Sequence, residues 1–193
     1  MRRLKLLAFP FGVLLLLSGC IVRSLHPLYT DENVIFDTRL IGQWAEEDSK
    51  EIWEFSQQGE QRYKCVVYEE DGEQSILVAR LLEIKGKVFL DFFPTELDRQ
   101  EGVFYQLHIL PVHSFAYVKQ IEPTLQISFP SSDWLQELLE KNPDAIRHEV
   151  LDKDDIILSA STEALQTFWL AHLDTEGAFA ELSDLQRKQT STQ

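Results

Sequence analysis

The stretch YKCVVYEEDGEQSILVARLLEIKGKVFLDFF, residues 63–93, decides the fold class. It holds three largely apolar runs, at residues 63–68, 76–84 and 88–93, which alternate with a period of two or are continuously apolar, as strands are. The segments between the runs are short, and short connections join antiparallel strands, because parallel strands need crossovers of a dozen residues or more. The stretch therefore predicts an antiparallel meander.

The strand pattern continues on both sides of this stretch. Pro111 interrupts it and should mark a bend, a bulge or an edge, because proline cannot donate a ladder hydrogen bond. We expect a mainly β chain that forms a barrel or a strongly curved sheet, since closure removes exposed strand edges. The further predicted strands are residues 40–45, 52–55, 104–110, 112–121, 125–129 and 156–160.

Two short helices interrupt the strands. Ser131 or Ser132 can cap the first helix, which should stop near Asn142-Pro143. The second helix covers residues 162–173. We expect both to pack their apolar sides on the sheet or across a barrel mouth. Their apolar faces carry Trp134, Leu135, Leu138 and Leu139 in the first helix, and Leu165, Phe168, Trp169 and His172 in the second.

The chain is strongly acidic. Its 193 residues include 18 Lys and Arg against 32 Asp and Glu, which gives a net charge of −14. This charge argues against nucleic acid as a partner, because phosphate binding relies on a surplus of Lys and Arg. It also argues against an electrostatic hold on anionic lipid.

The N-terminus has the organisation of an export signal. Basic residues precede an apolar stretch at 6–17, which is shorter than the about 20 residues of a membrane-spanning helix. The stretch ends in Leu17-Ser18-Gly19-Cys20, and this order resembles the lipobox of bacterial lipoproteins. The resemblance implies that Cys20 is the lipidation site: its thiol receives diacylglycerol, the preceding peptide is cut, and its new amino group is acylated with a fatty chain such as palmitate.

The lipobox resemblance predicts a location and a division of the chain. Acyl chains on Cys20 would hold the protein on a membrane essentially permanently. In enteric-type sorting an Asp after the cysteine retains a lipoprotein in the inner membrane, so Ile21 indicates the outer membrane, facing the periplasm or the cell surface. We expect a signal peptide at 1–19, a lipidated tether at 20–38, a barrel-like domain at 39–175 and a polar tail at 176–193.

A local motif suggests a family for the body. Gly42-Gln43-Trp44 resembles the Gly-x-Trp signature of lipocalins, which are eight-stranded barrels that hold small apolar ligands. The resemblance implies that Gly42 permits a tight bend and that Trp44 plugs the closed end. The helix at 162–173 fits a lipocalin helix that follows the last strand. We find no Arg after the final predicted strand that is placed to stack on Trp44. Residues 24–30 are similar to the opening of uncharacterised bacterial lipoproteins, a resemblance that carries no activity.

Residues that carry chemistry are few. Once Cys20 is acylated, Cys65 has no disulfide partner and is predicted to be a small buried residue rather than a catalytic thiolate. His108 and His113, with Asp91 on a neighbouring strand, could form a zinc site, or one histidine could face solvent while the other makes an ordinary hydrogen bond. We predict no cofactor and no catalytic residue.

These observations lead to a non-catalytic envelope lipoprotein as the predicted function. Its partners would be the membrane, through Cys20, and a small apolar ligand in the barrel. The alternative is an acidic interaction module without a pocket that docks a basic envelope protein, as some periplasmic lysozyme inhibitors do on small barrels. A third possibility is an enzyme that uses His108 and His113.

Overall fold

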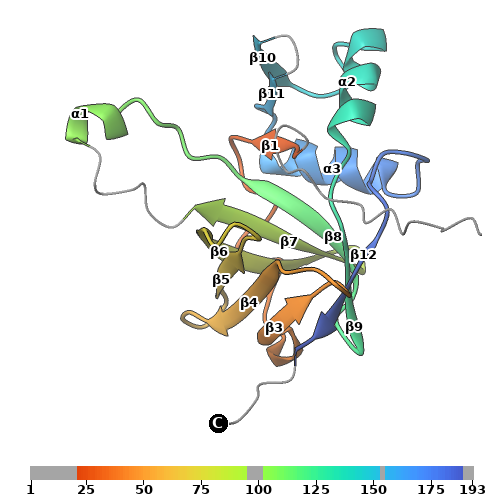
Figure 1. Cartoon of the computed structure of the whole chain (residues 1–193). Helices are drawn as coiled ribbons and strands as arrows, with labels where there is room; N and C mark the ends of the chain where they lie inside the picture. Colours follow the sequence, from red (N-terminus) through yellow and green to blue (C-terminus); the bar gives the residue numbers. More distant parts are fainter. Residues whose placement is uncertain (1–20, 95–101, 153–154, 189–193) are drawn as a thin grey trace, which may run out of the picture.

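The computed structural model describes residues 21–94, 102–152 and 155–188. Within these residues the protein is mainly β (Figure 1). Strands form a closed barrel, and short strands and helices lie together above it in the view of Figure 1. The predicted fold class, a lipocalin-like antiparallel barrel with short helices packed on it, is confirmed.

Eight antiparallel strands close the barrel. They follow the order β6-β5-β4-β3-β12-β9-β8-β7, and β7 pairs with β6 to complete the ring. The short strand β2 (Val34–Ile35) pairs with β6 from outside the ring. The barrel strands are β3 (Gly42–Ala45), β4 (Ile52–Gln57), β5 (Tyr63–Tyr68), β6 (Gln74–Ile84), β7 (Lys87–Pro94), β8 (Ser114–Gln120), β9 (Thr124–Ser128) and β12 (Ser183–Arg187).

The strand that closes the barrel, β12, lies in the segment 176–193 that was predicted as a polar tail. It pairs with β9 on one side and with β3 on the other. The tail prediction is wrong for these residues, because β12 directs one buried apolar side chain, Leu185, into the core while Asp184 and Gln186 remain exposed. One apolar residue in five gives no periodic signal.

Strands β6, β7 and β8 form a wall between two hydrophobic cores. Their side chains alternate between the faces of the sheet, so Leu81 and Leu90 lie in the barrel core, whereas Leu82 and Phe89 lie in an outer core. The outer core is completed by the helices and by the N-terminal segment. The barrel is therefore packed on both faces of this wall.

The outer layer combines a small sheet with the two predicted helices. Ser131 and Ser161 cap the helices, each accepting a hydrogen bond from the backbone N–H three residues further on. The strand predicted at 156–160 belongs to this sheet and not to the barrel, and the second helix precedes the closing strand instead of following it. The elements are β1 (Arg23–Ser24), β11 (Asp155–Leu158) and β10 (His148–Asp152), in this order in the sheet, and the helices α2 (Ser132–Lys141) and α3 (Thr162–His172).

Residues 21–38 were predicted as a tether but are packed on the folded body. Val22 and Leu28 are buried in the outer core. The backbone of Ser24 exchanges two hydrogen bonds with that of His113, at 2.9 and 2.8 Å. We call residues 21–29 the strap. The sequence was interpreted as a linker because of Pro27 and the polar run at residues 29–33.

Residues 104–110 were predicted as a strand, but the structure places the short helix α1 (Val103–Gln106) and a turn there. Both edges of β7 are already paired, with β6 and with β8, so this apolar segment has no strand to join. In Figure 1, α1 stands well away from the barrel.

Candidate functional site

One end of the barrel is closed by Trp44 and Arg187. The side chain of Trp44 is fully buried, and its Nε1 donates a hydrogen bond of 2.8 Å to the carbonyl oxygen of Leu40, the last residue of the 3-10 helix η1 (Thr38–Leu40). The guanidinium carbon of Arg187 lies 4.2 Å from the centroid of the Trp44 ring, a cation–π contact. The expectation that no arginine after the final predicted strand stacks on Trp44 is wrong, because Arg187 lies on β12, which was not among the predicted strands.

Arg187 also ties together the backbone at this end. It donates hydrogen bonds to the carbonyl oxygens of Ile41, at 2.7 Å, and Arg39, at 2.5 Å, and to the carboxylate of Glu122, at 3.1 Å. Gly42 has a φ of +135°, and a Cβ there would overlap the Nη1 atom of Arg187. The glycine is therefore required both for the bend and for the approach of the guanidinium group.

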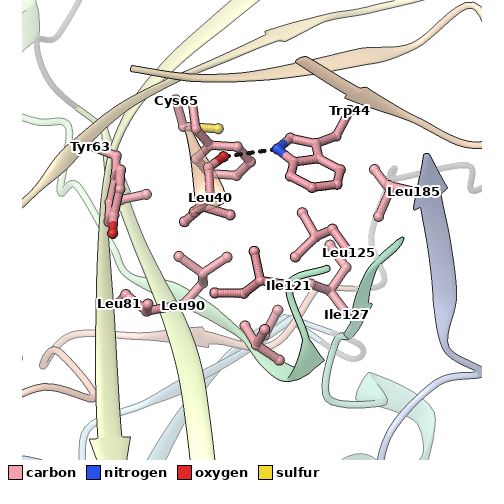
Figure 2. Packing of buried hydrophobic residues seen from close by; sticks show 14 of the residues in the cluster. Leu40, Trp44, Tyr63, Cys65, Leu81, Leu90, Ile121, Leu125, Ile127 and Leu185 are labelled. Atoms are coloured by element: carbon pink, nitrogen blue, oxygen red, sulfur yellow. Dashed lines mark hydrogen bonds between the residues drawn. The ribbon is translucent and has the colours of Figure 1, made fainter. Parts of the chain in front are cut away.

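Buried side chains fill the interior next to this plug (Figure 2). They come from strands all around the ring, so the interior is a packed core at this depth. A ligand could reach the plug only by displacing them, which directs attention to the opposite end. The labelled side chains are Leu40, Trp44, Tyr63, Cys65, Leu81, Leu90, Ile121, Leu125, Ile127 and Leu185.

Three aromatic residues on the interior face form a cluster toward the other end, which we call the mouth cluster. Trp53 lies near the start of β4, Phe92 near the end of β7 and Phe129 just after β9, and in the ring these positions lie away from Arg187. The ring centroid of Trp53 is 5.7 Å from that of Phe92 and 6.2 Å from that of Phe129. Trp53 and Phe129 are half-buried. Glu51 accepts a hydrogen bond of 2.6 Å from the indole N–H of Trp53, which fixes the ring.

Acidic turns surround the same end. The turn after β3 contains Glu46, Glu47 and Asp48, and the turn after β5 contains residues 69–71, which are Glu, Glu and Asp. Because β3 and β5 run in the same direction, both turns lie at the end of the barrel that holds the mouth cluster. The mouth therefore combines an aromatic interior with an acidic rim.

Asp91 and His113 form a buried pair on the outside of the barrel. The Nδ1 atom of His113 lies 2.7 Å from Oδ1 of Asp91, and the other carboxylate oxygen accepts a hydrogen bond of 2.8 Å from the backbone N–H of Leu28. Burial raises the pKa of the Asp91 carboxyl above its usual value, and the hydrogen bond from His113 opposes this shift. The pair thus attaches the strap to the barrel wall.

The predicted zinc site is not assembled in the structure. Asp91 and His113 meet, but His108 is exposed on the α1 side, and its Nδ1 lies 2.7 Å from the carbonyl oxygen of Phe104. Across residues 21–94, 102–152 and 155–188, no three His, Cys, Asp or Glu side chains gather as a metal site would require. Of the two alternatives considered, the ordinary hydrogen bond describes His113.

Of the two cysteines, the structure describes only Cys65. Cys65 is buried inside the barrel, as predicted, and burial raises the pKa of its thiol, which keeps it protonated and unreactive. Cys20 lies outside the described residues, so its lipidation stays a prediction. None of the helices in the described part of the chain combines the length and the apolar character that crossing a bilayer requires.

Comparison with protein-family models, with curated proteins and with solved structures finds no match for this chain. The mouth cluster was not predicted from the sequence. Alternation along β4 and β9 assigns Trp53 and Phe129 to one face of each strand, but only closure of the ring brings these faces together.

Proposed function

We propose that the protein is a non-catalytic lipoprotein of the bacterial cell envelope, anchored through acyl chains on Cys20, that binds a small apolar ligand at the mouth cluster. The lipobox order supports the anchor. The observation that carries the ligand proposal is the aromatic cluster in which the half-buried Trp53 and Phe129 pack against the buried Phe92, at the end of the barrel opposite the Arg187 plug.

The packing limits the kind of ligand. Phe55, Cys65 and Leu90 are buried below the cluster, so a ligand would be small and would lie against Trp53 and Phe129. Aromatic faces stabilise flat or aliphatic apolar groups by excluding water, at about 25 cal/mol for each Å² of apolar surface buried. The acidic rim favours a ligand that is neutral or carries a positive group.

Native mass spectrometry of the full-length protein after gentle extraction tests the ligand. We expect an apolar passenger on the wild-type protein and its loss, by about tenfold or more, in Trp53→Leu, since losing about 1.4 kcal/mol lowers affinity tenfold. The matched control is Trp134→Leu, because Trp134 is also half-buried but lies on α2 in the outer layer. A wild-type protein that carries no passenger and takes up none of an apolar ligand panel would contradict the proposal.

Replacement of the anchoring sulfur tests the membrane attachment. Wild-type protein should incorporate radioactive palmitate and sediment with membranes, whereas Cys20→Ser should remain unlabelled. Cys65→Ser serves as the control, because Cys65 is buried in the barrel and is not expected to carry lipid. Absence of label in the wild-type protein would rule out the anchor.

The acidic rim supports a second candidate, the docking of a basic envelope protein. Two acidic turns at one end of the barrel form a surface that attracts positive charge. Binding of a lysozyme as a basic probe should weaken strongly as salt is raised. It should also weaken in Glu47→Lys and Glu70→Lys, which reverse exposed charges in these turns. Binding that is insensitive to both changes would exclude this candidate.

A further inference from the structure

An exposed apolar segment projects from the molecule between β7 and β8. We call residues 104–110 the apolar arm (Figure 1). Large apolar side chains on a soluble surface normally lie singly, whereas here five occur within seven residues. Their exposed fractions are Phe104 78%, Tyr105 55%, Leu107 76%, Ile109 36% and Leu110 66%.

The arm is also free of charge. Residues 103–113 read VFYQLHILPVH and contain no Asp, Glu, Lys or Arg, in a chain with 32 acidic residues. The turns at 46–48 and 69–71, by contrast, are acidic. An anionic membrane surface repels such acidic turns, but it would not repel the arm.

The C-terminal end of the arm leads to a residue close to the proposed anchor. Three residues after the arm, the backbone of His113 is hydrogen-bonded in both directions to that of Ser24, at 2.9 and 2.8 Å. Ser24 is the fourth residue after Cys20, and four extended residues span at most about 14 Å. Acyl chains on Cys20 would therefore enter the bilayer close to the base of the arm.

We propose that the apolar arm is a second membrane contact, which inserts Phe104, Leu107 and Leu110 into the interfacial region of the bilayer that holds the acyl chains of Cys20. This inference rests on the proposed lipid anchor. Tyr105 and His108 would place their polar groups at the level of the lipid headgroups, where amphipathic rings accumulate. Two contacts would fix the orientation of the barrel on the membrane, which a single acylated residue does not do.

Because of the anchor, a bilayer is favoured over a partner protein as the surface that the arm contacts. Once Cys20 holds the protein on the membrane, insertion of the arm becomes an intramolecular step with a high effective concentration of lipid. A segment of seven residues that would bind vesicles weakly by itself can then remain inserted. A partner protein would have to supply an equally large uncharged apolar surface.

A fluorescent probe on the arm tests the proposal in the acylated full-length protein. Leu107→Cys provides a thiol for a polarity-sensitive dye, because Cys20 is acylated and Cys65 is buried. The labelled protein is reconstituted in vesicles of phosphatidylethanolamine and phosphatidylglycerol, and quenching by spin-labelled lipid is measured. Gln61→Cys is the matched control, since Gln61 is an exposed residue on the β4–β5 turn at the plugged end of the barrel.

We expect the emission at position 107 to shift to the blue and to be quenched several-fold more strongly than at position 61. Equal quenching at both positions, or none at 107 in protein that floats with the vesicles, would overturn the arm contact and leave the anchor intact. Protein that does not float would overturn the anchor and the arm contact with it. A dye that is shielded only in native membranes would assign the arm to a protein partner and reject the bilayer.

Discussion

Gly42, Trp44 and Arg187 are close together although β3 and β12 lie at opposite ends of the chain. The guanidinium group covers the indole ring and reaches the carbonyl oxygens of Arg39 and Ile41 only because Gly42 has no side chain in its path. This end of the barrel is thus closed by the guanidinium group of Arg187 stacked on the Trp44 ring, and the absence of a Cβ at Gly42 makes that stacking possible. The Gly-x-Trp motif identified two of these three parts, and the third became visible only when β12 was placed.

Gly42→Ala should destabilise the protein by about 2–4 kcal/mol. About 1–2 kcal/mol arises from the strain of the positive φ, and the remainder arises from hydrogen bonds of Arg187 that must break, at about 1 kcal/mol each. Gly72→Ala is the control, because Gly72 also has a positive φ, of +94°, but has no atom within 4 Å of the added Cβ. Urea denaturation should show a clearly larger loss for Gly42→Ala, and equal losses would mean that Arg187 is not displaced.

Cys65 should resist thiol reagents in the folded protein. Its side chain is fully buried, and burial raises the pKa of the thiol, so that thiolate is scarce at neutral pH. In a Cys20→Ser background, an aromatic disulfide reagent should release its coloured product only after denaturant is added. Rapid reaction under native conditions would show that the barrel interior around β5 is open to solvent.

Among the elements, the local hairpins were predictable and the long-range pairings were not. Strands β4 to β7 follow one another with short turns, so period and turn residues in one stretch of sequence are enough to find them. β12 and the strap depend on partners far away in the chain. β12 has too few apolar residues to show a period, and the strap contains Pro27 and leads into the polar residues 29–33. The arm was misread for the opposite reason, because its apolar residues suggest a strand but no partner edge is free.

Removal of β12 should open the barrel. A chain that ends at Leu182 lacks the strand between β3 and β9, so both of these strands acquire an unpaired edge and the interior loses Leu185. We expect loss of the near-ultraviolet circular dichroism signal and aggregation. A chain that ends at Lys188 keeps β12 and should retain the native spectrum. A native spectrum in the shorter chain would contradict the role of β12.

The attachment of the strap should depend on pH through Asp91. Burial raises the folded pKa of Asp91 above its ordinary value of 3.8, so the folded chain binds this proton more tightly than the unfolded chain does. The corresponding stabilisation is complete below 3.8 and is lost as the pH rises through the folded pKa. As the pH rises from 3.8 through the folded pKa of Asp91, the free energy of unfolding of the wild-type protein should therefore fall relative to that of Asp91→Asn. Denaturation at a series of pH values measures this difference. A constant difference would show that Asp91 titrates like an exposed carboxyl.

At the scale of the whole molecule, the two hydrophobic cores share one wall. Each of β6, β7 and β8 places alternate side chains in the barrel core and in the outer core, so neither core can lose its structure without exposing the other. Trp44 and Trp53 report on the first core, and Trp134 and Trp169 report on the second. The two parts should therefore unfold as one unit.

Two variants test this cooperativity. One keeps only the tryptophans of the barrel and the other keeps only those of the outer layer, with Phe at the remaining two positions. Their fluorescence transitions in denaturant should each coincide with the transition that far-ultraviolet circular dichroism records for the same variant. Separate transitions within one variant would identify the outer layer as an independently melting unit.

The position of β12 near the C-terminus has a consequence for how the protein folds during its synthesis. A polypeptide emerges from a ribosome, or passes through a translocation pore, starting from its N-terminus. Seven of the eight barrel strands are synthesised before the helices α2 and α3, and the eighth, β12, is complete only at residue 187. Until then the barrel has a gap between β3 and β9, so its ring of hydrogen bonds can be completed only after nearly the whole chain has been synthesised.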